Sequence, residues 1–124
     1  MGVVLTIGLL QVLPIGRQTN PVTPVEHRFD RHLQVTAEVD KLLDRACMDC
    51  HSNETRWPWY SRVAPVKWMV ARDVEKGRKV MNLSEWSQRS GRRPELAASM
   101  LMSACATAKA GRMPRFPYAI LHPE

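Results

Sequence analysis

A five-residue motif near the middle of the chain, Cys47-Met48-Asp49-Cys50-His51, constrains the fold more than any other feature. C-x-x-C-H is the attachment pattern of c-type haem. Two thiols three positions apart near a helix end can reach the two vinyl groups of one porphyrin and form thioethers. The adjacent imidazole can then bind the iron. The motif therefore predicts one covalently bound haem c, held by Cys47 and Cys50 and ligated by His51.

Three other interpretations of these cysteines stay open. A redox dithiol of the thioredoxin kind lies near a strand–helix–strand unit, and the sequence shows no such unit. A structural zinc site needs four ligands, so Cys105 or His122 would have to join the motif. The third interpretation is an inert pair of cysteines in a small core.

Short helices separated by long loops are predicted for the rest of the chain. Thr36 suits the N-cap of a helix with apolar residues at 3.6-residue spacing that runs into the motif. Pro65 suits the first turn of a second helix, and Gly77 weakens its end. Pro94 opens a third helix, which Gly111 is expected to cap. No stretch alternates with period two for long, so we expect an all-α domain.

The chain divides into three predicted parts. Residues 1–16 are largely apolar and uncharged, which predicts an uncleaved membrane-anchor helix, with a signal peptide or a buried helix as alternatives. Residues 17–32 are polar and contain two prolines, which is typical of a linker. Residues 33–124 are expected to form the folded domain, and a core this small usually needs a staple such as a cofactor.

Basic residues dominate the main body. Residues 56–115 contain 13 Lys and Arg against four Asp and Glu, and the whole chain has a net charge of +6. Such a surface favours an acidic partner, here a redox protein, and the alternative is an ordinary solvated surface. No nucleic-acid partner is expected, because the basic residues follow no stacking or groove-reading pattern.

The iron bound by His51 needs a sixth ligand or an open position. Met113 is the first candidate, because it precedes a proline in a stiff loop, and His122 is the second. The other nitrogen of His51 is expected to bond a carbonyl group around Pro58 or Pro65. Three methionines in or beside predicted helices are expected to fill the core: Met81, Met100 and Met102.

Three aromatic residues follow the motif closely: Trp57, Trp59 and Tyr60. Large flat side chains suit a porphyrin edge and exclude water from it, so they are candidate cofactor-binding residues. The alternative is that they belong to an ordinary core.

The run Cys47-x-x-Cys50-His51-Ser52-Asn53-x-Thr55-x-Trp57-Pro58-Trp59-Tyr60-Ser61 resembles the signature of the bacterial haem-binding domain family, small membrane-tethered c-type proteins. The likeness continues through Asp73-Val74-x-x-Gly77-Arg78 and Asn82-x-Ser84-Glu85-Trp86 to Met113-Pro114, Tyr118 and Leu121-His122-Pro123-Glu124. The resemblance implies a periplasmic, mostly helical domain close to a small cytochrome c, with Met113 as the distal ligand. The family continues into a further helix, so we expect either a truncated chain or a dispensable last helix. Cys105 is outside the family pattern.

Three functions fit these features. The first is one-electron transfer in the periplasm by a protein anchored to the inner membrane through residues 1–16. The second is a haem-based sensor or small-ligand-binding protein with an open or displaceable sixth position. The third is a structural role in which haem serves as the core. The sequence shows no nucleophilic triad, paired carboxylates or phosphate-binding loop, so we expect no enzyme.

Overall fold

The computed structural model describes residues 2–91, 93–116 and 118–121. Their regular elements are α-helices and short 3-10 helices (η), with no strand among them, in agreement with the expected all-helical class. In chain order they are α1 (Gly2–Val12), η1 (Val25–His27), η2 (Phe29–Arg31), α2 (Ala37–Ala46), α3 (Met48–His51), η3 (Trp59–Arg62), α4 (Val66–Val80), η4 (Leu83–Glu85), α5 (Trp86–Ser90), α6 (Pro94–Lys109) and α7 (Tyr118–Leu121).

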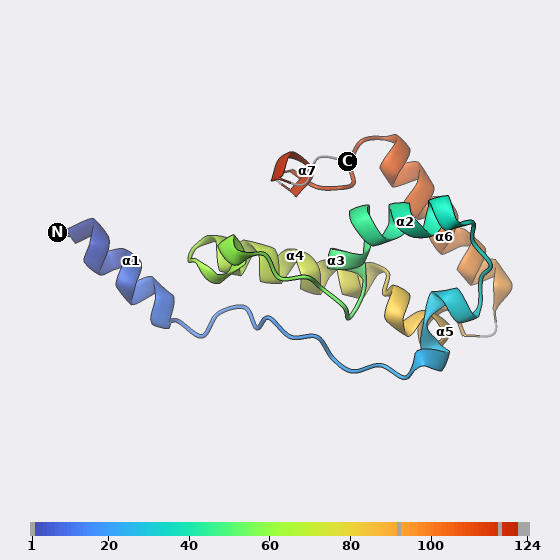
Figure 1. Cartoon of the computed structure of the whole chain (residues 1–124), viewed down its shortest axis with the longest axis horizontal. Coiled ribbons are helices and arrows are strands. Elements are labelled where there is room, and N and C mark those ends of the chain that lie inside the picture. Colours follow the sequence, from blue (N-terminus) through green and yellow to red (C-terminus); the bar gives the residue numbers. More distant parts are fainter. Residues whose placement is uncertain (1, 92, 117, 122–124) are drawn as a thin grey trace.

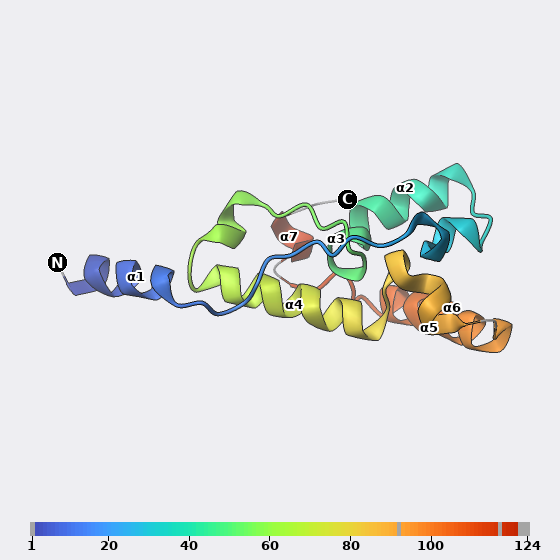
Figure 2. The same ribbon diagram turned by 90° about the horizontal axis from the view of Figure 1, so that it is seen from below.

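The central helix of the body is α4, and the short helix α3 lies against it (Figure 1). Helices α2 and α6 overlap in Figure 1 but lie on opposite sides of the body in Figure 2. Helix α1 projects from one end of the molecule in both views. The α3–α4 contact therefore lies in the middle of the domain, flanked by the other helices.

A small apolar core lies beyond the C-terminal end of α4. Its four buried residues come from η2, the end of α4, η4 and α5: Phe29, Met81, Leu83 and Trp86. Side chains of α2 and α3 pack against it, as do Ala97, Met100 and Ala104 of α6. Met81 and Met100 thus pack in or against the core as expected, whereas Met102 is 73% exposed.

Several predicted helix ends are confirmed. The Thr36 hydroxyl accepts a hydrogen bond from the Val39 N–H at the start of α2. Helix α6 begins at Pro94, and Gly111 follows its end with φ +64°, a left-handed conformation that glycine adopts without strain. Gly77, expected to weaken the end of the second helix, lies in the last turn of α4, which ends at Val80.

Helix α1 overturns the expectation for residues 1–16. It has 11 residues, whereas a spanning helix needs about 20. Within the part of the chain that the structure describes, no helix is both long and apolar enough to cross a membrane. The expected membrane anchor is therefore wrong, and the periplasmic, inner-membrane location expected with it has no support.

Residues 17–32 run along the body rather than away from it (Figure 2). The Asn20 amide donates to the Thr55 carbonyl at 2.9 Å, and His27 Nδ1 lies 2.8 Å from the Ser87 hydroxyl oxygen. Phe29 belongs to the core. The segment expected as a linker thus contributes hydrogen bonds and a buried aromatic ring to the domain.

Substitution of the two tryptophans Trp86 and Trp59 tests the position of the core. Trp86 is 1% exposed and Trp59 is 78% exposed. We expect Trp86→Ala to lower the free energy of unfolding by about 3–5 kcal/mol, because it leaves a large cavity. Trp59→Ala, the matched control, should change it little. Urea unfolding followed by circular dichroism measures both, and equal losses would contradict the assigned core.

Candidate functional site

The C-x-x-C-H motif packs on the last turns of α4 through a contact that leaves no room for a side chain. Gly77 is buried there, and a Cβ atom at this position would overlap the carbonyl oxygen of Cys50 and lie 3.3 Å from its Cβ atom. Gly77 therefore permits close approach of two helices. The contact lies in the last turn of α4, which ends at Val80.

The imidazole of His51 is fixed by the end of the same helix. Its Nδ1 atom lies 3.1 Å from the carbonyl oxygen of Met81, the C-cap residue of α4. Because a carbonyl oxygen only accepts, Nδ1 carries the proton and donates, and Nε2 keeps a free lone pair. The expected acceptor near Pro58 or Pro65 is therefore wrong, but the kind of partner, a backbone carbonyl, is the expected one.

Neither thiol of the motif forms a disulfide, and both cysteines are half-buried. Burial and the negative charges of Asp49 and Asp73 raise the pKa of Cys50 to about 11. A redox-active dithiol requires the opposite, a lowered thiol pKa, so this environment disfavours a thioredoxin-like function.

A zinc site also lacks support. Among the residues that the structure describes, no group of three or more His, Cys, Asp or Glu side chains could hold a metal ion. Cys105, one candidate for the fourth ligand, is exposed on α6. His122, the other candidate and the second choice for a distal haem ligand, lies outside the described residues.

The donor set does fit a covalently held haem. Cys47 and Cys50 are unbridged, and Cys50 is protonated at neutral pH. In the adjoining His51, Nδ1 is engaged by the Met81 carbonyl, so Nε2 is the ring nitrogen left to act as a ligand. These are the two kinds of donor that thioether attachment and axial ligation require.

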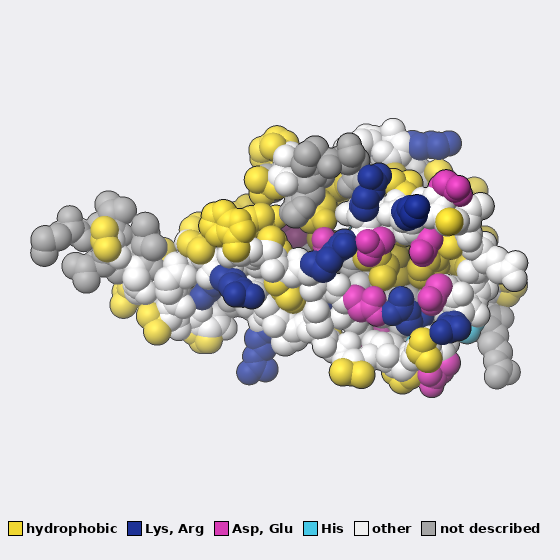
Figure 3. Space-filling model, viewed as in Figure 1, with side chains coloured by type: hydrophobic (Ala, Val, Ile, Leu, Met, Phe, Trp, Pro, Cys, Tyr) yellow, Lys and Arg dark blue, Asp and Glu magenta, His cyan; other side chains and the backbone are white. Residues whose placement is uncertain are grey.

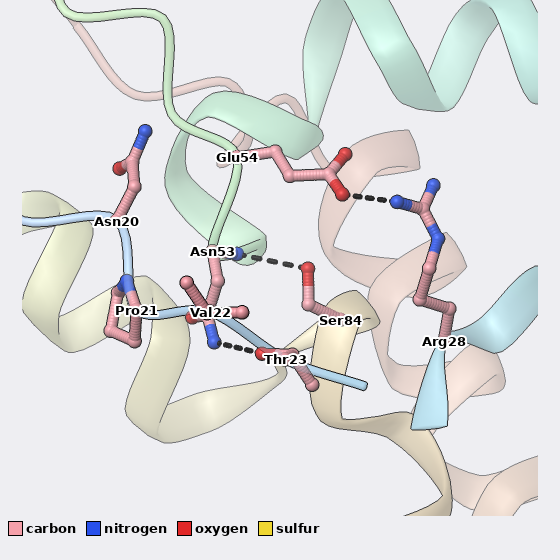
Figure 4. Close-up of a pocket in the computed structure, with 8 residues that line it drawn as sticks. All are labelled: Asn20, Pro21, Val22, Thr23, Arg28, Asn53, Glu54 and Ser84. Carbon is pink, nitrogen blue, oxygen red and sulfur yellow. Dashed lines mark hydrogen bonds and ion pairs between the residues drawn. The ribbon is translucent and has the colours of Figure 1, made fainter. Parts of the chain in front are cut away.

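The loop after the motif is held by a buried polar network that the sequence analysis did not identify. The Asn53 side chain donates to Thr23, and its backbone N–H donates to the Ser84 hydroxyl (Figure 4). The same side chain also donates to Glu85. The Asn53 side-chain oxygen accepts from Asn82 at 2.9 Å. Burial of so many polar groups is favourable only because each has a partner. The network joins the motif to η4 and to the N-terminal segment.

The surface beside this network is a polar pocket lined by residues 20–23, 53 and 54, together with Arg28 and Ser84 (Figure 4). Arg28 and Glu54 form an ion pair across it. Within this lining Asn53 also bonds Thr23 and Ser84, so the polar groups of the pocket support the loop.

Arg78 of α4 binds the same loop from the other side. Its guanidinium donates to the Ser52 carbonyl and the Thr55 hydroxyl, and also to the Thr19 carbonyl and the Asn20 side chain. Burial lowers the pKa of Arg78. One planar group thus ties α4, the motif loop and the N-terminal segment together. Local periodicity cannot show this role, since every partner is more than 20 residues away.

The predicted distal ligand, Met113, lies in the loop between α6 and α7 and is 38% exposed. Arg115 in this loop forms an ion pair with Asp73 of α4. Tyr118, where α7 begins, donates its hydroxyl to Asp49 of the motif at 2.8 Å. The structure therefore brings the loop that carries Met113 to α3 and α4 through its neighbours. The role of Met113 as an iron ligand stays a prediction.

The three aromatic candidates do not share one environment. The Trp57 indole N–H donates to Asn20. Trp59 is 78% exposed, and apolar side chains gather on the surface over η3 (Figure 3). Tyr60 lies edge-on to Trp59 with ring centroids 5.9 Å apart. Burial, with smaller contributions from Asp49 and Cys50, raises the pKa of Tyr60, which places it near the motif. Their cofactor contacts remain predictions.

Comparison with known proteins identifies one family. The sequence model of the haem-binding domain family matches residues 5–124. No curated protein and no solved structure matches the chain. The likeness to a small cytochrome c implied by the sequence therefore has no support from a solved structure.

Substitution of Gly77 tests the contact between α3 and α4. We expect Gly77→Ala to lower the free energy of unfolding by about 1–3 kcal/mol, because the new methyl group overlaps backbone that cannot rotate away. Gly8→Ala is the matched control, since Gly8 also lies within a helix but a methyl group added there would meet nothing within 4 Å. Urea unfolding compares them, and a Gly77→Ala protein as stable as the control would refute the contact.

Proposed function

The chain belongs to the haem-binding domain family, and we propose that it binds one haem c covalently and acts as a one-electron carrier. The observation that carries this proposal is the state of His51 beside the two thiols. A backbone carbonyl holds Nδ1, so Nε2 is available to the iron, and Cys47 and Cys50 are unbridged. We propose a carrier rather than an enzyme, because the sequence shows no distal pair of acid and base groups such as a catalytic haem would need.

Each residue of the motif has a distinct part in this proposal. Cys47 and Cys50 hold the cofactor as thioethers, and His51 is the proximal ligand. When bound, haem supplies an iron that changes its oxidation state by one electron. The bond from His51 to Met81 keeps the ring in one orientation, and Gly77 keeps the motif pressed against α4. A fixed ligand limits the reorganisation that accompanies each electron transfer.

Met113 is the proposed sixth ligand. A thioether ligand raises the reduction potential relative to a second histidine, so the choice sets the range in which the carrier works. Its partial exposure, 38%, also favours the alternative function, a haem-based sensor in which a small molecule displaces the methionine.

An acidic redox protein is the proposed partner. Helix α4 exposes the basic residues Arg72, Lys76 and Lys79, close in sequence to the Gly77 contact. Basic side chains of this kind accelerate encounter with an acidic surface at low ionic strength.

The covalent attachment is tested by removing both thiols. After expression in a host competent for c-type maturation, the natural chain should carry the mass of one haem and stain for haem peroxidase activity on a denaturing gel. The Cys47→Ala/Cys50→Ala variant should show neither property. Cys105→Ala is the matched control and should retain both. A natural chain with the mass of the bare polypeptide would refute the proposal.

The sixth ligand is tested by Met113→Ala in the haem-loaded protein. We expect loss of the methionine–iron absorption band, a lower reduction potential and rapid carbon monoxide binding to the reduced form. Met102→Ala, which removes an exposed methionine on α6, is the control. Rapid carbon monoxide binding by the natural protein would instead favour the sensor.

A further inference from the structure

We propose that Tyr118 and Arg115 are positioning residues: they tie the Met113 loop to the haem-attachment helix and to α4 at two points and so keep the sixth ligand on the iron. This inference rests on the proposed function, because it concerns the ligand that Met113 supplies.

The first tie ends inside the haem-attachment motif itself. The Tyr118 hydroxyl donates to Asp49 Oδ2 at 2.8 Å, and Asp49 stands between the two cysteines. The other carboxylate oxygen, Oδ1, accepts from the backbone N–H and the Nε–H of Arg56, each at 3.0 Å. The Asp49 side chain is only 13% exposed. Tyr118 therefore bonds a shielded carboxylate that is already fixed on its other side.

The second tie ends on the face of α4 that contacts the motif. Arg115 Nη1 lies 3.0 Å from Asp73 Oδ1. Asp73 precedes Gly77 by four residues, so both project from the same face of the helix. This pair is half-exposed and is therefore weaker than the bond to Asp49.

The two ties restrict Met113 because they are close to it in sequence. Two extended residues span about 7 Å, so the backbone of Met113 stays within that distance of Arg115. With both ties intact, the part of the α6–α7 loop that neither tie holds lies between the end of α6 and Arg115. Release of Arg115 or Tyr118 lengthens the mobile segment and gives the methionine more conformations away from the iron.

The test uses the haem-loaded protein and three single variants. Tyr118→Phe removes one hydroxyl group and keeps the ring. Arg115→Gln removes one charge, and Arg112→Gln is its matched control, since it removes the same charge from the same loop and leaves both ties in place. Two measurements are made: carbon monoxide binding to the reduced protein, and amide hydrogen exchange of residues 112–116 in the oxidised protein.

We expect Tyr118→Phe to speed carbon monoxide binding about tenfold, which corresponds to about 1.4 kcal/mol, the scale of a hydrogen bond to a charged group. Arg115→Gln should give a smaller increase and Arg112→Gln none. Faster amide exchange should accompany each increase.

Two results would overturn the inference in different ways. If the loop exchanges faster in Tyr118→Phe but carbon monoxide binding is unchanged, while Met113→Ala does alter ligation, then the ties do not position the ligand and the proposed function stands. If Met113→Ala leaves the spectrum unchanged, the proposed sixth ligand and this inference fail together, whereas covalent haem attachment is judged separately by mass.

Discussion

The structure depends on how α3 crosses the last turns of α4. At one point the Cys50 backbone lies against Gly77, and at the next the His51 ring bonds the Met81 carbonyl. Gly77 lies in the last turn of α4 and Met81 is the residue that caps it, so both contacts lie at the C-terminal end of this helix. Together they fix the position of the attachment helix along α4 and the rotation of the imidazole.

Polar interactions provide much of the support for this crossing, because the apolar core is small. Asn53 and Arg78 each bond several partners around the motif loop. Meanwhile apolar side chains remain exposed on η3, α4 and α7, among them Met69, 54% exposed, and Ile120, 66% exposed (Figure 3). A domain of this size commonly completes its core with a cofactor. A large flat group attached to α3 is therefore consistent with both the fixed polar frame and the apolar surface.

The features that the sequence predicts correctly are local. Thr36, Pro94 and Gly111 mark helix ends because capping depends on residues within one turn. The packing role of Gly77 is not predicted for the converse reason: its small size serves a contact with Cys50, 27 positions away, which periodicity does not record. The acceptor for His51 is predicted at the wrong residue for the same reason, because the contact with Met81 spans 30 positions of the chain. Phe29 reads as part of a polar linker because a single aromatic residue gives no periodic pattern.

The two sides of the proposed iron site are built differently, and this difference bears on function. The imidazole proposed as the proximal ligand is held by the backbone carbonyl of Met81, a group that every side-chain substitution leaves in place. The Met113 loop is held by side chains, one on a shielded carboxylate and one in a half-exposed ion pair. Side-chain ties of this kind contribute only about 1–3 kcal/mol each, or less where they are exposed to solvent. In the proposed function, attachment and proximal ligation are therefore rigid, whereas distal ligation is adjustable. Small changes at Arg115, Asp73 or Tyr118 would then shift the chain between the proposed six-coordinate carrier and a protein with an accessible iron position, without disturbing the motif proposed to hold the cofactor.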